Sequence, residues 1–130
     1  MSINFTPRWA AILICDFERA YIAPEMRKIR RVIVLSSTQF NTWSAVDHGT
    51  CSVVPLSCTP PRAGDRRSIL IPQGIYKSLT RDVWAKCGMV STVSNDRLSR
   101  VRIGQRYMGE YVSKADMLPI QAASRLALGL

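Results

Sequence analysis

Residues 28–36 read Lys28-Ile29-Arg30-Arg31-Val32-Ile33-Val34-Leu35-Ser36. After the two arginines, the stretch is a run of branched aliphatic residues that ends at Ser36. Branched residues favour strands, and a short apolar run with polar residues on both sides is typical of a buried strand. We therefore predict a strand over residues 31–35 with the two arginines at its start.

The same pattern recurs before and after this stretch. Apolar runs at residues 9–15 and 51–56 predict two more strands, and the second run has Pro55 near its end, where a missing N–H is tolerated. Further strands are expected over residues 68–71, 83–87 and 100–103. Polar, proline- and glycine-containing loops separate them, over residues 20–27, 36–49 and 59–65. Short strands at this spacing predict a small, strongly twisted β-barrel or sandwich.

Two segments have helical character. Residues 113–130 place apolar side chains on one face, and Ser113 and Asp116 have the spacing of a capping box. Because Pro119 would interrupt a helix begun at Ser113, we expect the regular part to start at Asp116. A short helix is expected over residues 94–98.

Length and hydropathy place the chain among compact single domains. It has 130 residues, a hydrophobic fraction of 47%, and a mean hydropathy of +0.02. We expect one domain over residues 1–130. No apolar run approaches the ~18 residues that a membrane-spanning helix needs, and no signal peptide is visible, so a cytoplasmic protein without a membrane partner is expected.

The charge balance suggests a polyanionic partner. The chain carries 18 Lys and Arg against nine Asp and Glu, and 14 of the 18 are Arg. Arginine binds phosphate in a two-point fashion, so this surface suits nucleic acid, although the charge could also serve solubility alone. The four cysteines form no CxxC pair and His48 is the one histidine, which argues against a zinc site and favours reduced core cysteines, with Cys15, Cys58 and Cys87 beside apolar residues.

Several motifs in order resemble one known family. The stretch Lys28–Ser36 is followed by V-V-P-L-S at residues 53–57, by W-A-K-C-G-M-V-S-T-V at residues 84–93, and by a terminal segment ending L-A-L-G-L. The series resembles the MazF/PemK toxins of toxin–antitoxin systems over nearly the whole chain. The resemblance implies an SH3-like β-barrel with a C-terminal α-helix and a homodimer. It also implies cleavage of single-stranded RNA without a metal or other cofactor, and a cognate antitoxin as partner.

The resemblance also implies site residues. Arg30 takes the position of the family's catalytic arginine, and Ser57 that of the hydroxyl residue at the scissile phosphate, with Thr59 beside it. Arg31 replaces the usual proline. Lys86 keeps a positive charge of the third motif, but Gly88 removes its carboxylate and Ser91 stands where an arginine is common. These departures leave the proton-transfer scheme open.

The base for the 2′-hydroxyl is the least defined role. Glu25 is the first candidate, because it precedes Arg30 by five residues in the adjoining loop, and Asp16, Glu18 and His48 are alternatives. Each residue also has a purely structural reading, such as a solvated arginine or a strand-end cap. RNA contacts are expected from five basic residues and one hydroxyl residue around these positions: Lys28, Arg31, Thr59, Arg62, Arg66 and Arg67.

Other side chains leave two readings open. Trp9 and Trp43 could stack on RNA bases or fill the core or a dimer contact. Four further arginines lie at residues 97, 100, 102 and 106, without a guaranteed common face. The resemblance therefore implies a metal-independent endoribonuclease toxin. The alternative is a non-catalytic RNA-binding or protein-inhibiting module on the same barrel, which the loss of the carboxylate at Gly88 motivates.

Overall fold

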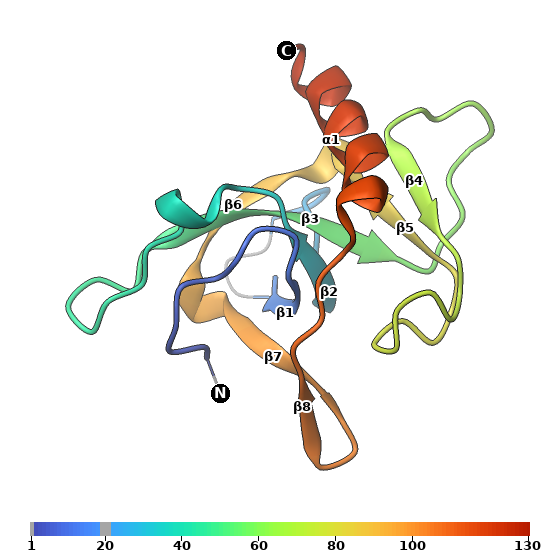
Figure 1. Ribbon diagram of the computed structural model, residues 1–130. Coiled ribbons are helices and arrows are strands. Elements are labelled where there is room, and N and C mark those ends of the chain that lie inside the picture. Colours follow the sequence, from blue (N-terminus) through green and yellow to red (C-terminus); the bar gives the residue numbers. More distant parts are fainter. Residues whose placement is uncertain (1, 19–21) are drawn as a thin grey trace.

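The computed structural model describes residues 2–18 and 22–130, so the start of the loop expected over residues 20–27 lies outside the described residues. Within this part of the chain, eight strands and one α-helix form the fold (Figure 1). The strands are β1 (Ile12–Asp16), β2 (Ile29–Val34), β3 (Thr50–Ser57), β4 (Ser68–Ile71), β5 (Val83–Lys86), β6 (Ser91–Ser94), β7 (Leu98–Ile103) and β8 (Arg106–Met108). Helix α1 (Lys114–Leu128) closes the chain, and the expectation of a mainly β fold with one C-terminal helix is confirmed.

Every strand pair in the sheet is antiparallel. The strand order is β4-β5-β3-β2-β1-β7-β8, and β6 pairs with β3. The strand predicted from residues 31–35 is β2, and it lies between β1 and β3 at the centre of the order. The branched residues of this strand are therefore covered by neighbours on both edges, which explains why its apolar run is the strongest in the sequence.

Two strands, β6 and β8, were not predicted from the sequence, and both are short and polar. β6 pairs with the first half of β3, whereas β5 pairs with the last residues of β3, and the 3-10 turn Cys87–Met89 joins them. β5 and β6 are thus two parts of one interrupted strand. β8 forms a hairpin with β7 across Gly104, whose positive φ of 60° suits a tight turn. The helix expected over residues 94–98 is only a 3-10 turn, Asn95–Arg97.

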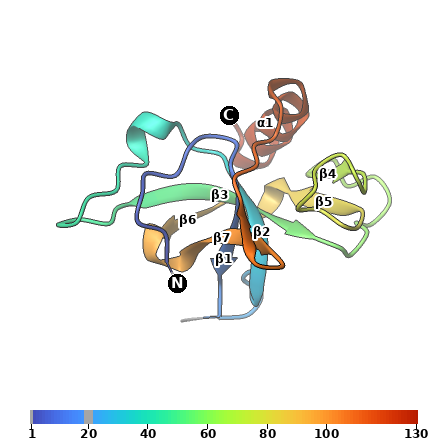
Figure 2. The same ribbon diagram turned by 60° about the horizontal axis from the view of Figure 1, so that its bottom comes forward.

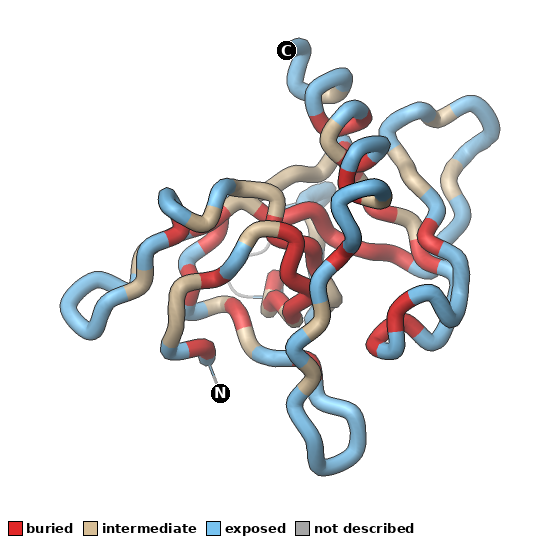
Figure 3. The backbone as a smooth tube through the Cα atoms, in the orientation of Figure 1, coloured by how far each residue is buried: buried red, intermediate tan, exposed pale blue. Residues whose placement is uncertain are grey.

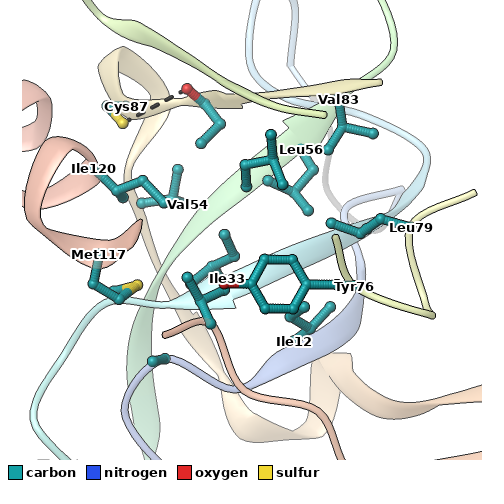
Figure 4. Close-up of a cluster of buried hydrophobic side chains, with 14 of the residues drawn as sticks. Ile12, Ile33, Val54, Leu56, Tyr76, Leu79, Val83, Cys87, Met117 and Ile120 are labelled. Atoms are coloured by element: carbon teal, nitrogen blue, oxygen red, sulfur yellow. Dashed lines mark hydrogen bonds between the residues drawn. The ribbon is translucent and has the colours of Figure 1, made fainter. Parts of the chain in front are cut away.

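The two faces of the sheet bury separate clusters. One face contributes Ile12, Ile33, Val54, Leu56 and Ala85 to a core that α1 completes with Met117 and Ile120 (Figure 4). α1 lies over β4 and the turn after β5, and Figure 2 shows it on one side of the sheet. The opposite face holds a smaller cluster, built around Leu13, Cys15, Val32, Val53 and Leu98. We call these the helix face and the second face.

The cap of α1 follows the sequence, but its first turn does not. The Ser113 hydroxyl accepts a hydrogen bond from the Asp116 N–H at 3.2 Å, as a capping residue should. The helix begins at Lys114 rather than at Asp116, and it includes Pro119. The expectation of a later start was wrong. The Tyr76 hydroxyl anchors this turn, because it donates to the Asp116 carboxylate at 2.6 Å and accepts from the Ser113 N–H at 2.9 Å.

Three cysteines are buried and one is not. Cys15, Cys51 and Cys87 are buried and free, and burial raises the pKa of Cys15 and of Cys51 to about 12. Cys58 is exposed, which corrects the expectation that it belongs to the core; it follows the last residue of β3, where the chain leaves the sheet. Among the described residues, no helix is long and apolar enough to cross a membrane.

Candidate active site

Arg30 is held at the start of β2 by its own backbone neighbours. It is half-buried, it pairs with Cys15 of β1 in the sheet, and its Nε donates to the Arg27 carbonyl at 2.9 Å. Within residues 2–18 and 22–130, no carboxylate forms an ion pair with its guanidinium. The terminal nitrogens of this arginine are therefore available to an anion, and a guanidinium can hold two phosphate oxygens at once.

The strand register brings Ser57 toward Arg30. β2 and β3 pair at Val32 and Pro55, and Arg30 and Ser57 both lie two residues further along, toward the same end of the two strands. Because side chains alternate along a strand, both residues are on the second face. The Ser57 hydroxyl is nearly buried and accepts a hydrogen bond from the Thr59 N–H at 3.1 Å. That bond leaves the hydroxyl proton free to donate, and the Thr59 side chain is exposed.

Lys86 lies on the same face and is tied to a carboxylate that the sequence analysis missed. Ser57 pairs with Trp84, so Lys86, two residues later in β5, points to the same side. The Lys86 ammonium donates to the Ser68 hydroxyl at 3.4 Å, and that hydroxyl lies 3.5 Å from the Asp65 carboxylate. Asp65 belongs to a loop that the sequence marks only as irregular, so no motif pointed to it.

Asp65 is held as an anion by its neighbours. The backbone N–H of Arg67 and then its side chain donate to the carboxylate, and these bonds, together with the charges of Arg67 and Lys86, place the pKa of Asp65 below its usual range. The Arg67 Nε lies 3.2 Å from an Asp65 carboxylate oxygen. The site thus contains a carboxylate beside Lys86 that is ionised at neutral pH.

Arg67 also occupies the space that Gly88 leaves. A Cβ at Gly88 would lie 3.1 Å from the Arg67 Cδ and 3.4 Å from one of its terminal nitrogens. Gly88 therefore permits the Arg67 side chain to pack against the turn after β5. The guanidinium of Arg67 therefore lies where the resembled motif has a carboxylate, and the same guanidinium contacts the Asp65 carboxylate.

These residues form an open end of the second face. Arg30, Trp84 and Lys86 are half-buried and Leu70 is 48% exposed, whereas the second-face residues closer to the centre, Val32 and Val53, are fully buried. Figure 3 shows the same change along the strands, from buried at the centre to exposed toward the loops. We name this set the open-face site: Arg30, Ser57, Asp65, Ser68, Trp84 and Lys86.

The candidates for the base lie in three different places. Glu25 is exposed in the segment before β2, and its carboxylate accepts from the Ile22 N–H at 3.0 Å. Asp16 pairs with Ile29 and so points away from the face of Arg30, and its carboxylate accepts from the Glu18 N–H at 2.9 Å. His48 lies in the loop between β2 and β3, where its Nδ1 contacts the Asp96 carboxylate at 2.6 Å.

The predicted RNA-binding residues divide between the two sides of the sheet. Lys28 is exposed immediately before β2 and has a positive φ of 74°. Arg31 follows Arg30 and points to the helix face, where its Nε is buried and has no hydrogen-bond partner among the described residues. Arg62, Arg66 and Arg67 are exposed around a groove of about 530 Å³ that Leu126 and Ala127 of α1 also line.

The two tryptophans differ in environment. Trp9 is half-buried against the helix-face core, in agreement with the core alternative considered for it. Trp43 stacks on His48 with ring centroids 5.0 Å apart and an angle of 17° between the rings. Within the described part of the chain, no group of three or more His, Cys, Asp or Glu side chains gathers where it could hold a metal ion.

Comparison with known structures finds the same fold. MazF from Deinococcus radiodurans superposes with a TM-score of 0.71 at 14% identity, covering 98% of this chain and 100% of that one. An endoribonuclease from mycobacterial species gives a TM-score of 0.61 at 22% identity, covering 96% and 93%. A mycobacterial endoribonuclease in complex with its cognate antitoxin gives 0.60 at 23% identity, covering 95% and 96%.

Comparison at the level of sequence extends this result. The Escherichia coli (strain K12) protein YifN is 29% identical over an alignment of 146 positions, which spans 95% of this chain and 92% of YifN. The family described as PemK-like, MazF-like toxin of type II toxin-antitoxin system matches residues 8–128, which include β1 to α1 and every residue of the open-face site. The chain therefore belongs to the PemK-like and MazF-like toxin family of type II toxin–antitoxin systems.

Proposed function

We propose that this protein is an endoribonuclease toxin that cleaves single-stranded RNA, mRNA above all, by attack of a 2′-oxygen and without a metal. One observation carries the proposal: in a chain of this family, the strand register puts Arg30 and Ser57 at the same end of the second face, with no carboxylate paired to Arg30 among the described residues. An arginine that has no ion-pair partner, at the same strand end as a hydroxyl donor, is suited to bind a phosphodiester.

The proposed reaction uses groups on the open face and its loops. The 2′-oxygen forms a bond to phosphorus while the bond from phosphorus to the 5′-oxygen breaks. The products are a 2′,3′-cyclic phosphate and a 5′-hydroxyl. Arg30 binds two equatorial oxygens of the phosphorane, and Ser57 donates a hydrogen bond to the same group. Positioning and charge stabilisation then supply most of the rate.

Two proton transfers complete the reaction. The proton of the 2′-hydroxyl goes to a carboxylate, and Glu25 is our candidate. The Arg30 side chain donates a hydrogen bond to the Arg27 carbonyl, which belongs to the segment that carries Glu25. The leaving 5′-oxygen takes its proton from Lys86, which Ser68 orients and the nearby Asp65 keeps close to the site. Asp65 acts here as a positioning residue for Lys86.

Family membership supports a proposal for the biological setting. We propose that the protein acts as a homodimer in the cytoplasm, inhibits growth by degrading mRNA, and is neutralised by a cognate antitoxin. A mycobacterial endoribonuclease of the same fold is known in complex with its cognate antitoxin, which supports an antitoxin as the partner here.

A cleavage assay tests the proposal. A long single-stranded transcript is incubated with the protein in EDTA, and the new 5′ ends are labelled by polynucleotide kinase without prior phosphatase treatment. We expect discrete products whose ends accept the label directly, because a 5′-hydroxyl is free. Arg106→Ala, which alters an exposed arginine of β8, should leave the products unchanged. Products with 5′-phosphates, or activity that disappears with EDTA, would contradict the mechanism.

The same assay separates a second candidate function. Arg67 covers the position where the family motif has a carboxylate, so the open face could bind RNA without cleaving it. Intact RNA that nevertheless shifts in a native gel would favour a non-catalytic RNA-binding module. Protein that neither cuts nor binds RNA would favour a protein-inhibiting role.

A further inference from the structure

The hairpin β7–β8 and the N-terminal segment border a second groove. Two adjoining hollows of about 420 Å³ and 610 Å³ are both lined by Arg100 and Tyr107. The first also contains Phe5, Arg8 and Tyr111, and the second contains Trp43. Figure 1 shows the hairpin extending away from α1, so this groove and the helix lie in different parts of the molecule.

Arginine and aromatic side chains alternate within the groove. The Arg100 guanidinium lies 4.9 Å from the Phe5 ring centroid and 5.6 Å from that of Tyr107, and Arg102 lies 5.9 Å from Tyr107. The hairpin register explains this contact, because Tyr107 pairs with Arg102. Tyr107 is 58% exposed, so a face of its ring remains accessible.

The register also sorts the four arginines of residues 97–106. Arg100 and Arg102 share the face of Tyr107, whereas Arg106 pairs with Ile103 and points to the other side. The Arg97 side chain donates to the Asp16 carbonyl at 3.0 Å, away from the groove. Of the four arginines, Arg100 lines the groove and Arg102 lies beside it against Tyr107, whereas Arg106 serves as a control within the same hairpin.

The acidic side chains in the groove are engaged by other groups. The Asp96 carboxylate contacts His48, whose ring stacks on Trp43. The Glu110 carboxylate accepts three hydrogen bonds, from the Ser78 hydroxyl and from the N–H groups of Lys77 and Ser78. Arg8 and Arg100 line the groove and Arg102 lies beside it, so arginines outnumber the carboxylates of Asp96 and Glu110 on a surface that also presents flat aromatic rings.

We propose that this groove is a second RNA site, which binds the single strand outside the phosphate that is cleaved; the proposal rests on the proposed function. Base-stacking rings interleaved with arginines are the features by which proteins hold single-stranded nucleic acid. The net charge of +9 favours the same polyanion. A duplex keeps its bases stacked on each other and gains little from these rings.

The position of the groove in the sheet fits one continuous RNA strand. Only β1 separates β2, which carries Arg30, from β7, which carries Arg100. Arg30 pairs with Cys15 of β1, and Arg100 pairs with Leu13 two residues away. Two strand spacings are about 10 Å, a distance that a few nucleotides span. The groove is therefore close enough to hold the RNA that flanks the cleaved phosphate.

A binding assay with an uncleavable ligand tests this inference. A fluorescent single-stranded 2′-O-methyl RNA lacks the attacking hydroxyl, so anisotropy reports binding alone. We expect Tyr107→Ala to raise Kd about tenfold through lost stacking. Arg100→Gln should weaken binding and lower the slope of log K against log salt by about 0.7. Arg106→Gln and Phe40→Ala, an exposed arginine and an exposed aromatic outside the groove, should match the wild type.

The outcomes distinguish the groove from the proposed function. Unchanged RNA affinity in both groove variants would overturn the second site, even if the wild type cleaves natural RNA. Loss of affinity in both variants, in a protein that never cleaves natural RNA, would support the site and overturn the endoribonuclease. If the groove variants lose affinity for an acidic peptide such as polyglutamate but keep their affinity for RNA, the groove is a protein-docking surface and the inference is contradicted.

Discussion

The helix face and the open end of the second face use the same strands for opposite purposes. On β2, Ile33 is fully buried in the core that α1 covers, whereas Arg30 lies half-buried at the open end. On β3, Leu56 belongs to the covered core and its neighbour Ser57 to the site. Adjacent residues therefore differ in role because alternation along a strand sends them to different faces.

This contrast separates stability from chemistry. Substitutions on the helix face should unfold the protein, and those at the open end should slow RNA cleavage without unfolding it. Pairs of residues that are close in sequence but differ in environment can test that separation.

The largest effects are expected from Arg30 and Ile33. Arg30→Ala should slow cleavage about 10³-fold, because it removes the charge on the phosphorane, and should change the free energy of unfolding little. Ile33→Ala should cost about 2–5 kcal/mol of stability through the cavity it leaves. Single-turnover cleavage and urea unfolding of both variants measure the two effects. An Arg30→Ala protein that is folded and fully active would remove Arg30 from the site.

Lys86 is expected to have the next largest effect. Lys86→Gln keeps a polar but shorter side chain that cannot transfer a proton to the leaving oxygen, so cleavage should fall about 10–10²-fold. Lys114→Gln, on the exposed first turn of α1, is the matched control. If the substrate is changed to one with a better leaving group than the 5′-oxygen, the defect should shrink. Equal defects on both substrates would argue against an acid role for Lys86.

The cysteines extend the comparison to thiol chemistry. In the folded protein, Cys58 alone should react with a disulfide reagent within minutes, because Cys15, Cys51 and Cys87 are buried and burial raises their pKa. A bulky maleimide on Cys58 should block RNA from the adjacent Ser57 and reduce cleavage. The Cys58→Ser protein should be insensitive to the reagent. Fast reaction of more than one thiol, or full activity after labelling, would contradict the placement of this end of β3.

The smallest effect is expected from Glu110. Burial raises the pKa of this carboxyl, but hydrogen bonds from Ser78 and Lys77 outweigh burial, so the pKa lies below its ordinary value of 4.5. A lowered pKa stabilises the fold above pH 4.5, and that stability is lost as the pH falls toward the folded-state pKa. Glu110→Gln should therefore cost about 1 kcal/mol at pH 7 and progressively less in acid. Urea unfolding at pH 7 and pH 3.5 gives both values, and an equal deficit at the two would count against this account.

The sequence predicts the strongly patterned elements and misses those that depend on register. The branched runs that became β1, β2 and β3 are visible because both of their faces are apolar at the centre. β6 reads S-T-V-S and β8 reads R-Y-M, and such short polar strands form only because a neighbour supplies hydrogen bonds. Asp65 and the Arg100–Tyr107 contact were missed for the same reason, since folding rather than spacing brings their partners near.

A double-mutant cycle tests most directly whether Arg30 and Ser57 act on one phosphate. Arg30→Lys, Ser57→Ala and the double variant are compared with the wild type in single-turnover cleavage of one transcript in EDTA, with thermal unfolding as the check on folding. Residues that bind the same phosphorane should be coupled, so Ser57→Ala should slow the wild type about tenfold and the Arg30→Lys protein markedly less. Rates that multiply independently, within about twofold, would show that the two residues do not share the reacting group.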